Sequence, residues 1–171
     1  MIQKQKYQNI FKAVKNLIKK NKDLEVVFPV HLNPKVKNLA NKHLQNVDRI
    51  HLIEPLDYKP FINLMDRSHL ILTDSGGIQE EAPSLAKPVL VLRDTTERPE
   101  AVKAGTVKLV GTNQKKIFNE AQKLLNDENY YRQMAEAVNP YGDGKASERI
   151  RQYLLYEFGF AKKTGDEFGE Y

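Results

Sequence analysis

The sequence contains no cysteine and only four histidines among its 171 residues. The lack of cysteine excludes disulfides, thiolate metal sites and cysteine nucleophiles, and it is compatible with a reducing compartment. No histidines show the HExxH spacing of a zinc site. We therefore expect no metal, no cofactor and a cytoplasmic location.

Long apolar runs are also missing. No segment approaches the roughly 20 consecutive apolar residues that a membrane-spanning helix needs. The first ten residues, MIQKQKYQNI, lack the apolar core of a secretory signal. We therefore expect no membrane association.

The composition that is present, 40% hydrophobic and 29% charged residues, is typical of a soluble globular protein with one main domain. A formal net charge of +5 favours an anionic partner, either nucleic acid or a phosphorylated small molecule. Much of the excess lies in lysines 4–22, which alternate with apolar residues at helical spacing. This pattern is typical of a solvated helix face and needs no polyanion.

Short apolar runs alternate with helical patterns along the whole chain. This alternation predicts an α/β fold with a doubly wound, Rossmann-like parallel sheet covered on both faces. We expect the domain to span residues 1–158 and residues 159–171 to form a disordered tail. The predicted strands are residues 25–30, 49–53, 69–73, 88–92 and 107–110. The predicted helices are residues 5–20, 34–44, a segment capped by Asp57, a short segment after Gly77, 114–138 with a break near residues 126–127, and 145–158.

The stretch LTDSGGIQEEAPSL, residues 72–85, places two glycines between an apolar run and paired acids. In open parallel sheets, ligands bind beyond the carboxyl ends of the strands, where Ser75, Gly76 and Gly77 are expected. Glycines let backbone N–H groups approach a ligand, and the following helix N-terminus favours a phosphate or diphosphate. Ser75 would act as N-cap or donate to a phosphate oxygen. An ordinary turn remains the alternative.

The carboxylates of Glu80 and Glu81 would repel an anion at the turn itself. One turn further along the helix, such a carboxylate can accept hydrogen bonds from ribose hydroxyls. The alternative is a favourable interaction with the helix N-terminus, which contributes a few tenths of a kcal/mol to about 1 kcal/mol.

Several long motifs resemble the non-hydrolysing bacterial UDP-N-acetylglucosamine 2-epimerases. The main one is LTDSGGIQEEAPSLAKPVLVLRDTTERPEAVKAGTVKLVGT, residues 72–112, and the others are FPVHLNP (28–34), PFINLM (60–65) and NPYGDGKAS (139–147). The resemblance covers about residues 7–154. It implies the UDP-binding, C-terminal half of a GT-B fold.

The resemblance also assigns roles to single residues. Ser75, Gly76 and Gly77 resemble the diphosphate cradle, and Glu81 the residue that binds the ribose hydroxyls. The remaining assignments are Phe61 stacking on uracil, Leu56 contacting uracil through its backbone, Arg98 meeting the nucleotide or sugar and stabilising the leaving group, and His31 touching a regulatory second UDP-N-acetylglucosamine.

Each of these residues has a structural alternative. Phe61 belongs to an apolar helical stripe, which favours core packing, and His31 follows an apolar strand, which favours a structural histidine. Arg98 could pair with Glu97 or Glu100, although exposed pairs contribute only about 0 to 1 kcal/mol. Two acids near it, Asp94 and Glu97, could instead orient the arginine. Asp143 lies between two glycines, a composition that is typical of a turn.

The activity implied by the resemblance is interconversion of UDP-N-acetylglucosamine and UDP-N-acetylmannosamine. UDP is eliminated with loss of the C2 proton, giving 2-acetamidoglucal, and is then added to the other face. The family's N-terminal domain, with its catalytic carboxylates, is expected to be absent, since Met1 begins where a His-Arg-Arg-Glu-Asn type segment would end. We therefore expect the isolated chain to bind UDP but not to epimerise.

The expected partners are UDP or UDP-N-acetylglucosamine and a chain that supplies the missing domain, with full-length relatives forming homodimers. Two other classes stay open: the donor-binding half of a GT-B glycosyltransferase and, further behind, a basic nucleic-acid-binding module. The second lacks an aromatic-basic surface motif, so no nucleic-acid partner is expected.

Overall fold

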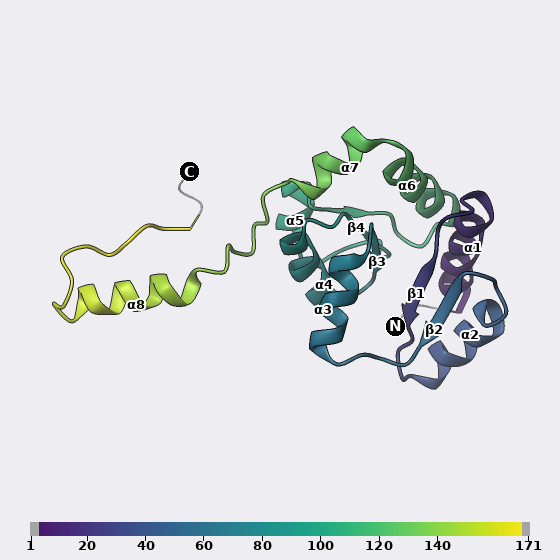
Figure 1. The fold of residues 1–171 in the computed structure, drawn as a ribbon, viewed down its shortest axis with the longest axis horizontal. Helices are drawn as coiled ribbons and strands as arrows, with labels where there is room; N and C mark the ends of the chain where they lie inside the picture. Colours follow the sequence, from purple (N-terminus) through teal and green to yellow (C-terminus); the bar gives the residue numbers. More distant parts are fainter. Residues whose placement is uncertain (1–3, 169–171) are drawn as a thin grey trace.

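The computed structural model describes residues 4–168, in which helices and short strands alternate (Figure 1). The elements are α1 (Lys4–Lys20), β1 (Val26–Pro29), α2 (Pro34–Leu44), β2 (Ile50–Ile53), α3 (Tyr58–Arg67), β3 (Ile71–Thr73), α4 (Gly76–Glu81), the 3₁₀ helix η1 (Ala82–Leu85), β4 (Val89–Val91), α5 (Pro99–Ala104), β5 (Val107–Leu109), α6 (Gln114–Asn126), α7 (Glu128–Ala135) and α8 (Ala146–Glu157). The five strands expected from the sequence are confirmed, whereas α5 was not predicted.

All strand pairs in the described part are parallel, but the strands form two hydrogen-bonded sets. One set joins β1 to β2, and the other has the order β3-β4-β5. The chain passes from the first set to the second through α3, between β2 and β3. Such a crossover is where doubly wound folds reverse their winding, and ligands bind beside it.

Strand β4 shows why the fold is doubly wound. Its residues Val89, Leu90 and Val91 are all fully buried. Because neighbouring strand residues point to opposite faces, Leu90 packs into a core with apolar residues of α1, α2 and α6, while Val89 and Val91 pack with those of α3, η1 and α5. The predicted α/β class with helices on both faces is therefore confirmed. The sheet itself is divided into the two sets described above.

Helix α1 buries the apolar stripe that the sequence showed. Phe11 and Leu17 are buried, and the lysines at positions 12, 19 and 20 are exposed. The end of α1 is held by Arg49, whose guanidinium donates to the carbonyls of Ile18, Asn21 and Leu24. Arg49 has a φ of 62°, unusual for a residue with a side chain, and these three hydrogen bonds offset its cost.

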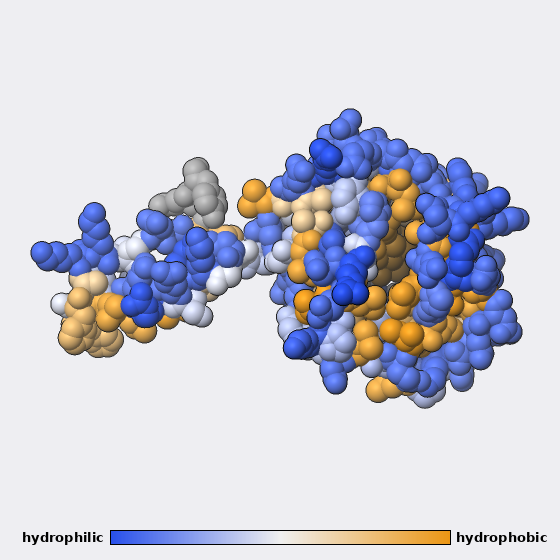
Figure 2. Space-filling view, viewed as in Figure 1, coloured by the Kyte–Doolittle hydropathy of each residue, from blue (hydrophilic) through white to orange (hydrophobic). Residues whose placement is uncertain are grey.

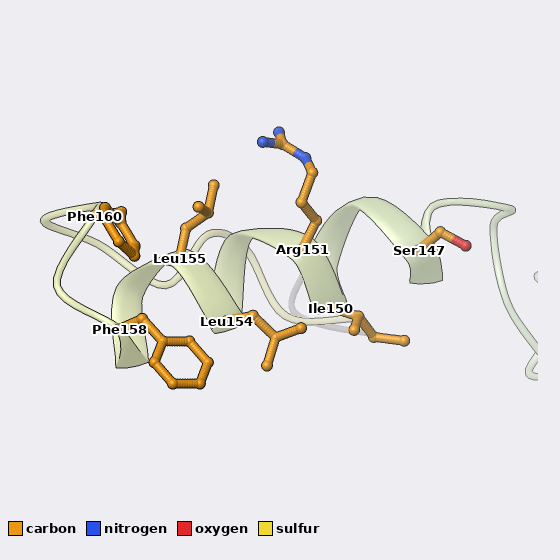
Figure 3. A pocket seen from close by; sticks show the side chains of 7 residues that line it. All are labelled: Ser147, Ile150, Arg151, Leu154, Leu155, Phe158 and Phe160. Carbon is orange, nitrogen blue, oxygen red and sulfur yellow. The ribbon is translucent and has the colours of Figure 1, made fainter.

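Helix α8 and the segment after it form an arm that stands apart from the body (Figure 1). Residues 146–168 include no buried residue, and apolar side chains gather on one side of the arm (Figure 2). Ile150, Leu154 and Phe158 point to that side, and Phe160 approaches Leu155 near the end of the helix (Figure 3). These residues line a shallow cavity of about 360 Å³.

The predicted boundary at residue 158 falls within this arm, and residues 158–168 form no helix or strand. Residues 1–3 and 169–171, which belong to the predicted domain start and tail, lie outside the described part. Across residues 4–168, every helix is too short or too polar to cross a bilayer.

Candidate functional site

The Ser-Gly-Gly turn lies at the carboxyl end of β3, as predicted. Ser75 occupies the N-cap position of α4, but its side chain makes no capping hydrogen bond. Gly76 and Gly77 have no positive φ, so the backbone conformation does not require glycine. The space beside Gly77 is open, because a Cβ on this residue would meet nothing nearer than the Ser75 hydroxyl, at 4.0 Å. The Ser75 side chain therefore leaves the first N–H groups of α4 uncapped.

Arg98 lies beside this turn because β4 pairs with β3. A Cβ on Gly76 would stand 3.8 Å from Nη2 of Arg98, so the end of the guanidinium faces the turn. Nε of Arg98 donates to the carboxylate of Glu80, and Nη1 donates to the carbonyl of Glu97 at 3.2 Å. The hydrogen bond and charge of Glu80 raise the pKa of Arg98 above its ordinary value. The guanidinium is thus held next to the first turn of α4, an arrangement that suits an anion.

A buried glutamine connects the turn to the arginine loop. Gln79 is fully buried; its Nε2 donates to the Ser75 carbonyl at 3.0 Å, and its Oε1 accepts from the Thr96 hydroxyl at 2.7 Å. The same hydroxyl accepts from the backbone N–H of Arg98 at 3.0 Å. The loops after β3 and β4 are therefore tied together by side chains.

Glu81 lines a neighbouring cavity of about 230 Å³. The opposite wall comes from the NPYGDG motif, where the Asn139 amide donates to the Glu80 carbonyl at 3.2 Å and to Ser84 Oγ at 2.7 Å. The Tyr141 hydroxyl reaches Glu100 at 3.4 Å. Sequence reasoning noted this motif without assigning Asn139 or Tyr141 to the site, although they complete the cavity.

Leu56 lies in the loop between β2 and α3, and Phe61 lies in α3. The Phe61 ring is half-buried and packs against the core around Met65 and Val91. Leu56 is exposed, at 37% of its surface. Asp57 occupies the N-cap position of α3, as predicted, although its side chain makes no capping hydrogen bond. Core packing of Phe61 is confirmed, and stacking on a base stays a prediction.

His31 follows β1, at the carboxyl end of the other strand set. The residue is exposed, and its Nδ1 accepts from the backbone N–H of Asn33 at 3.0 Å. Asn33 in turn caps α2 by accepting from Lys35 at 2.9 Å, with Pro34 opening the helix as predicted. Among residues 4–168, no group of three or more histidine or acidic side chains is placed to hold a metal ion.

The acids that sequence reasoning placed around Arg98 were the wrong ones. Asp94 binds Lys6 of α1 at 2.8 Å, and Glu97 contributes its carbonyl in place of a carboxylate. Glu100 lies against Tyr141. Glu80 is the ion-pair partner, 18 residues from Arg98 in the chain, because the pairing of β3 with β4 brings the two loops together.

The fold and site define a doubly wound α/β domain that can hold an anion at the carboxyl ends of its strands. The family model for UDP-N-acetylglucosamine 2-epimerase matches residues 1–155. The chain belongs to this family, as its motifs indicated.

Similar proteins agree with this assignment. The UDP-N-acetylglucosamine 2-epimerase of Bacillus subtilis is 55% identical over 161 residues, which are 94% of this chain and 42% of that protein. The Escherichia coli enzyme of the same name is 55% identical over 148 residues, 86% of this chain and 39% of that protein. The chain thus spans about two fifths of the length of these relatives.

Solved structures show the same fold. A UDP co-structure of S. aureus MnaA has a TM-score of 0.87 and 54% identity, covering 96% of this chain and 45% of that one. The UDP-GlcNAc 2-epimerase from Neisseria meningitidis, solved bound to UDP-GlcNAc, has a TM-score of 0.81 and 54% identity, covering 86% and 40%. The predicted class, a Rossmann-like half of a GT-B fold, is confirmed.

Proposed function

We propose that this chain is the UDP-binding half of a UDP-N-acetylglucosamine 2-epimerase, with the diphosphate at the turn between β3 and α4. One observation carries the proposal: the Arg98 guanidinium faces Gly76, in the first turn of a helix whose N–H groups the Ser75 side chain does not cap. The two similar structures solved with UDP and UDP-GlcNAc support the same ligand class.

The diphosphate would accept hydrogen bonds from the backbone of Gly76 and Gly77, from the free hydroxyl of Ser75 and from Arg98. These groups are donors, and Arg98 and the helix terminus add positive charge. Electrostatic stabilisation of this kind favours the departure of a diphosphate, because negative charge builds on the leaving oxygen. Arg98 would thus stabilise the leaving group.

The nucleoside would extend from the turn toward α3. Glu81 would accept hydrogen bonds from the ribose hydroxyls at the edge of the cavity that it lines. Phe61 would present its exposed ring edge or face to uracil, and Leu56 would contact the base through its backbone. His31 would touch a second, regulatory UDP-N-acetylglucosamine.

The proposed reaction eliminates UDP with loss of the C2 proton and then adds UDP to the other face of the 2-acetamidoglucal. Proton transfer needs general acid and base groups at the sugar. In the relatives, which are more than twice as long as this chain, such groups would come from the other half. We therefore expect this chain alone to retain UDP binding and to lack epimerase activity.

Calorimetry of the purified chain with UDP tests the binding, and a coupled assay with UDP-N-acetylglucosamine tests the activity. Saturable binding without turnover is expected. Absence of UDP binding would overturn the assigned site, and sustained epimerisation would overturn the predicted need for a second half.

The matched family is an epimerase family, so nothing in the comparisons favours the glycosyltransferase alternative. The net charge was the reason to consider nucleic acid, and part of it lies in the lysines at positions 12, 19 and 20 of α1, which are exposed to solvent. Titration of the chain with RNA and with UDP under the same salt conditions separates the two ligand classes, and we expect affinity for UDP.

A further inference from the structure

Arg98 is held at two separate points. Its backbone N–H donates to the Thr96 hydroxyl at 3.0 Å, and its Nε donates to the Glu80 carboxylate. A long arginine side chain otherwise loses much rotational freedom when it binds a ligand. Fixing it beforehand means that this entropy is not lost again on binding.

The hydrogen bonds of Gln79 define a single arrangement. The Ser75 carbonyl can only accept, so the amide NH₂ of Gln79 must face it. The amide oxygen is then left to accept from the Thr96 hydroxyl, whose own oxygen accepts from the Arg98 N–H. Because the amide is fully buried, losing either partner would leave an unsatisfied polar group.

Given the proposed UDP site, we infer that Gln79, Thr96 and Glu80 are positioning residues that set Arg98 against the Ser-Gly-Gly turn. Gln79 and Thr96 fix the separation of the two loops, since they bridge the Ser75 carbonyl and the Arg98 N–H. Glu80 fixes the direction of the guanidinium, so that Nη2 faces Gly76. None of the three needs to touch the diphosphate.

The positioning role of Glu80 and simple charge repulsion predict opposite changes in UDP affinity when Glu80 is neutralised. A carboxylate close to a diphosphate repels it, so neutralising Glu80 would tighten UDP binding if charge alone mattered. If Glu80 positions Arg98, Glu80→Gln weakens UDP binding, by about tenfold for the loss of a charged hydrogen bond. Glu97→Gln is the matched control, because it removes a nearby carboxylate but keeps the carbonyl that Arg98 uses.

Thr96 offers a second pair of variants. Thr96→Ser keeps the hydroxyl and is expected to bind UDP like the parent, whereas Thr96→Val keeps the shape and is expected to bind more weakly. Each variant is titrated with UDP and with uridine, which has no phosphate. Loss confined to UDP indicates a misplaced arginine, while equal loss for both ligands indicates general damage to the site and overturns the inference.

A double-mutant cycle with Arg98→Ala completes the test. In that background Glu80→Gln and Thr96→Val are expected to cause no further loss of UDP affinity. Tighter or unchanged UDP binding by Glu80→Gln in the parent background, or additive losses with Arg98→Ala, would overturn the inference. These outcomes can be distinguished from failure of the proposed function, because in that case the parent chain would not bind UDP at all.

Discussion

Two ion-pair clusters, one in the loops after β3 and β4 and one beside β5, use similar chemistry in different ways. At the site, Glu80 binds only Nε of Arg98, and Nη2 faces the glycine turn. On β5, Lys108 donates to Glu120 at 2.8 Å and to the Tyr130 hydroxyl at 2.8 Å, and that hydroxyl donates to Glu120 at 3.1 Å.

The two clusters differ in which groups their charged side chains face. In the β5 cluster the three groups bind one another, and Lys123 also lies over the Tyr130 ring, 3.6 Å from its centre. That arrangement ties α6 and α7 to the sheet. In the Arg98 cluster, Nη2 of the guanidinium faces the glycine turn. We therefore expect changes at Arg98 to alter ligand binding and changes at Glu120 to alter stability.

Replacement of Arg98 by alanine is expected to have the largest effect. UDP affinity should fall by about 10- to 100-fold, because a charged hydrogen bond to the diphosphate is lost. The pair with Glu80 is partly exposed, so the free energy of unfolding should change little. Calorimetry and thermal melts measure both quantities; a large loss of stability with unchanged affinity would reverse the contrast between the clusters.

Phe61→Ala is expected to weaken UDP binding by about tenfold if the ring stacks on uracil. Since the ring is also half-buried in the core, the matched variant is Phe61→Leu, which keeps apolar volume without an aromatic face. Both variants should lose affinity, although only alanine should lose much stability. Parent-like affinity in the leucine variant would leave Phe61 a packing residue.

Glu81→Ala is expected to lower UDP affinity by about fivefold through the loss of ribose hydrogen bonds. The specific readout is discrimination between UDP and 2′-deoxy-UDP, which the parent should show and the variant should lack. A variant that still discriminates between the two nucleotides would remove Glu81 from the ribose site.

Glu120→Gln should lower the free energy of unfolding by about 1 kcal/mol while leaving UDP binding unchanged. Glu128→Gln, which breaks an exposed pair with Arg132, is the control and should change stability less. Reduced UDP affinity in the Glu120 variant would show that the two clusters are coupled.

The pH dependence of stability follows from the same cluster. Burial raises the pKa of Glu120, but the hydrogen bond and charge of Lys108 outweigh it and hold that pKa below 4.5. Burial lowers the pKa of Lys108, but its hydrogen bonds to Glu120 and Tyr130 hold it above 10.5. The contribution of Glu120 to the free energy of unfolding is therefore present above pH 4.5 and lost on acidification. The contribution of Lys108 is present below pH 10.5 and lost at higher pH. Denaturant unfolding at a series of pH values should show the free energy of unfolding falling at both acid and alkaline pH. Glu120→Gln should reduce the fall at acid pH.

Much of the fold could be predicted because it depends on local pattern. The apolar stripe of α1 and the short β-branched runs identify elements whose burial is set by periodicity, as Leu17 and Leu90 show. Helix α5 was missed because six residues are too few for a periodic signal. The division of the strands into two sets was also missed, since hydrogen-bond pairing is not a local property.

The candidate site could likewise be predicted only where it depends on local sequence. The glycine turn was predictable because its composition is local and follows a strand. The pairing of Arg98 with Glu80 was not, because nearer acids such as Glu97 and Glu100 competed for the same role in the sequence. Only the pairing of β3 with β4 distinguishes them.

The central claim is that main-chain donors and Arg98 at the carboxyl ends of β3 and β4 hold a diphosphate. A crystal structure of this chain grown with UDP tests it most directly. We expect the diphosphate within hydrogen-bonding distance of the Gly76 and Gly77 N–H groups and of the Arg98 guanidinium. A nucleotide bound elsewhere on the chain, with this turn left open, would contradict the account.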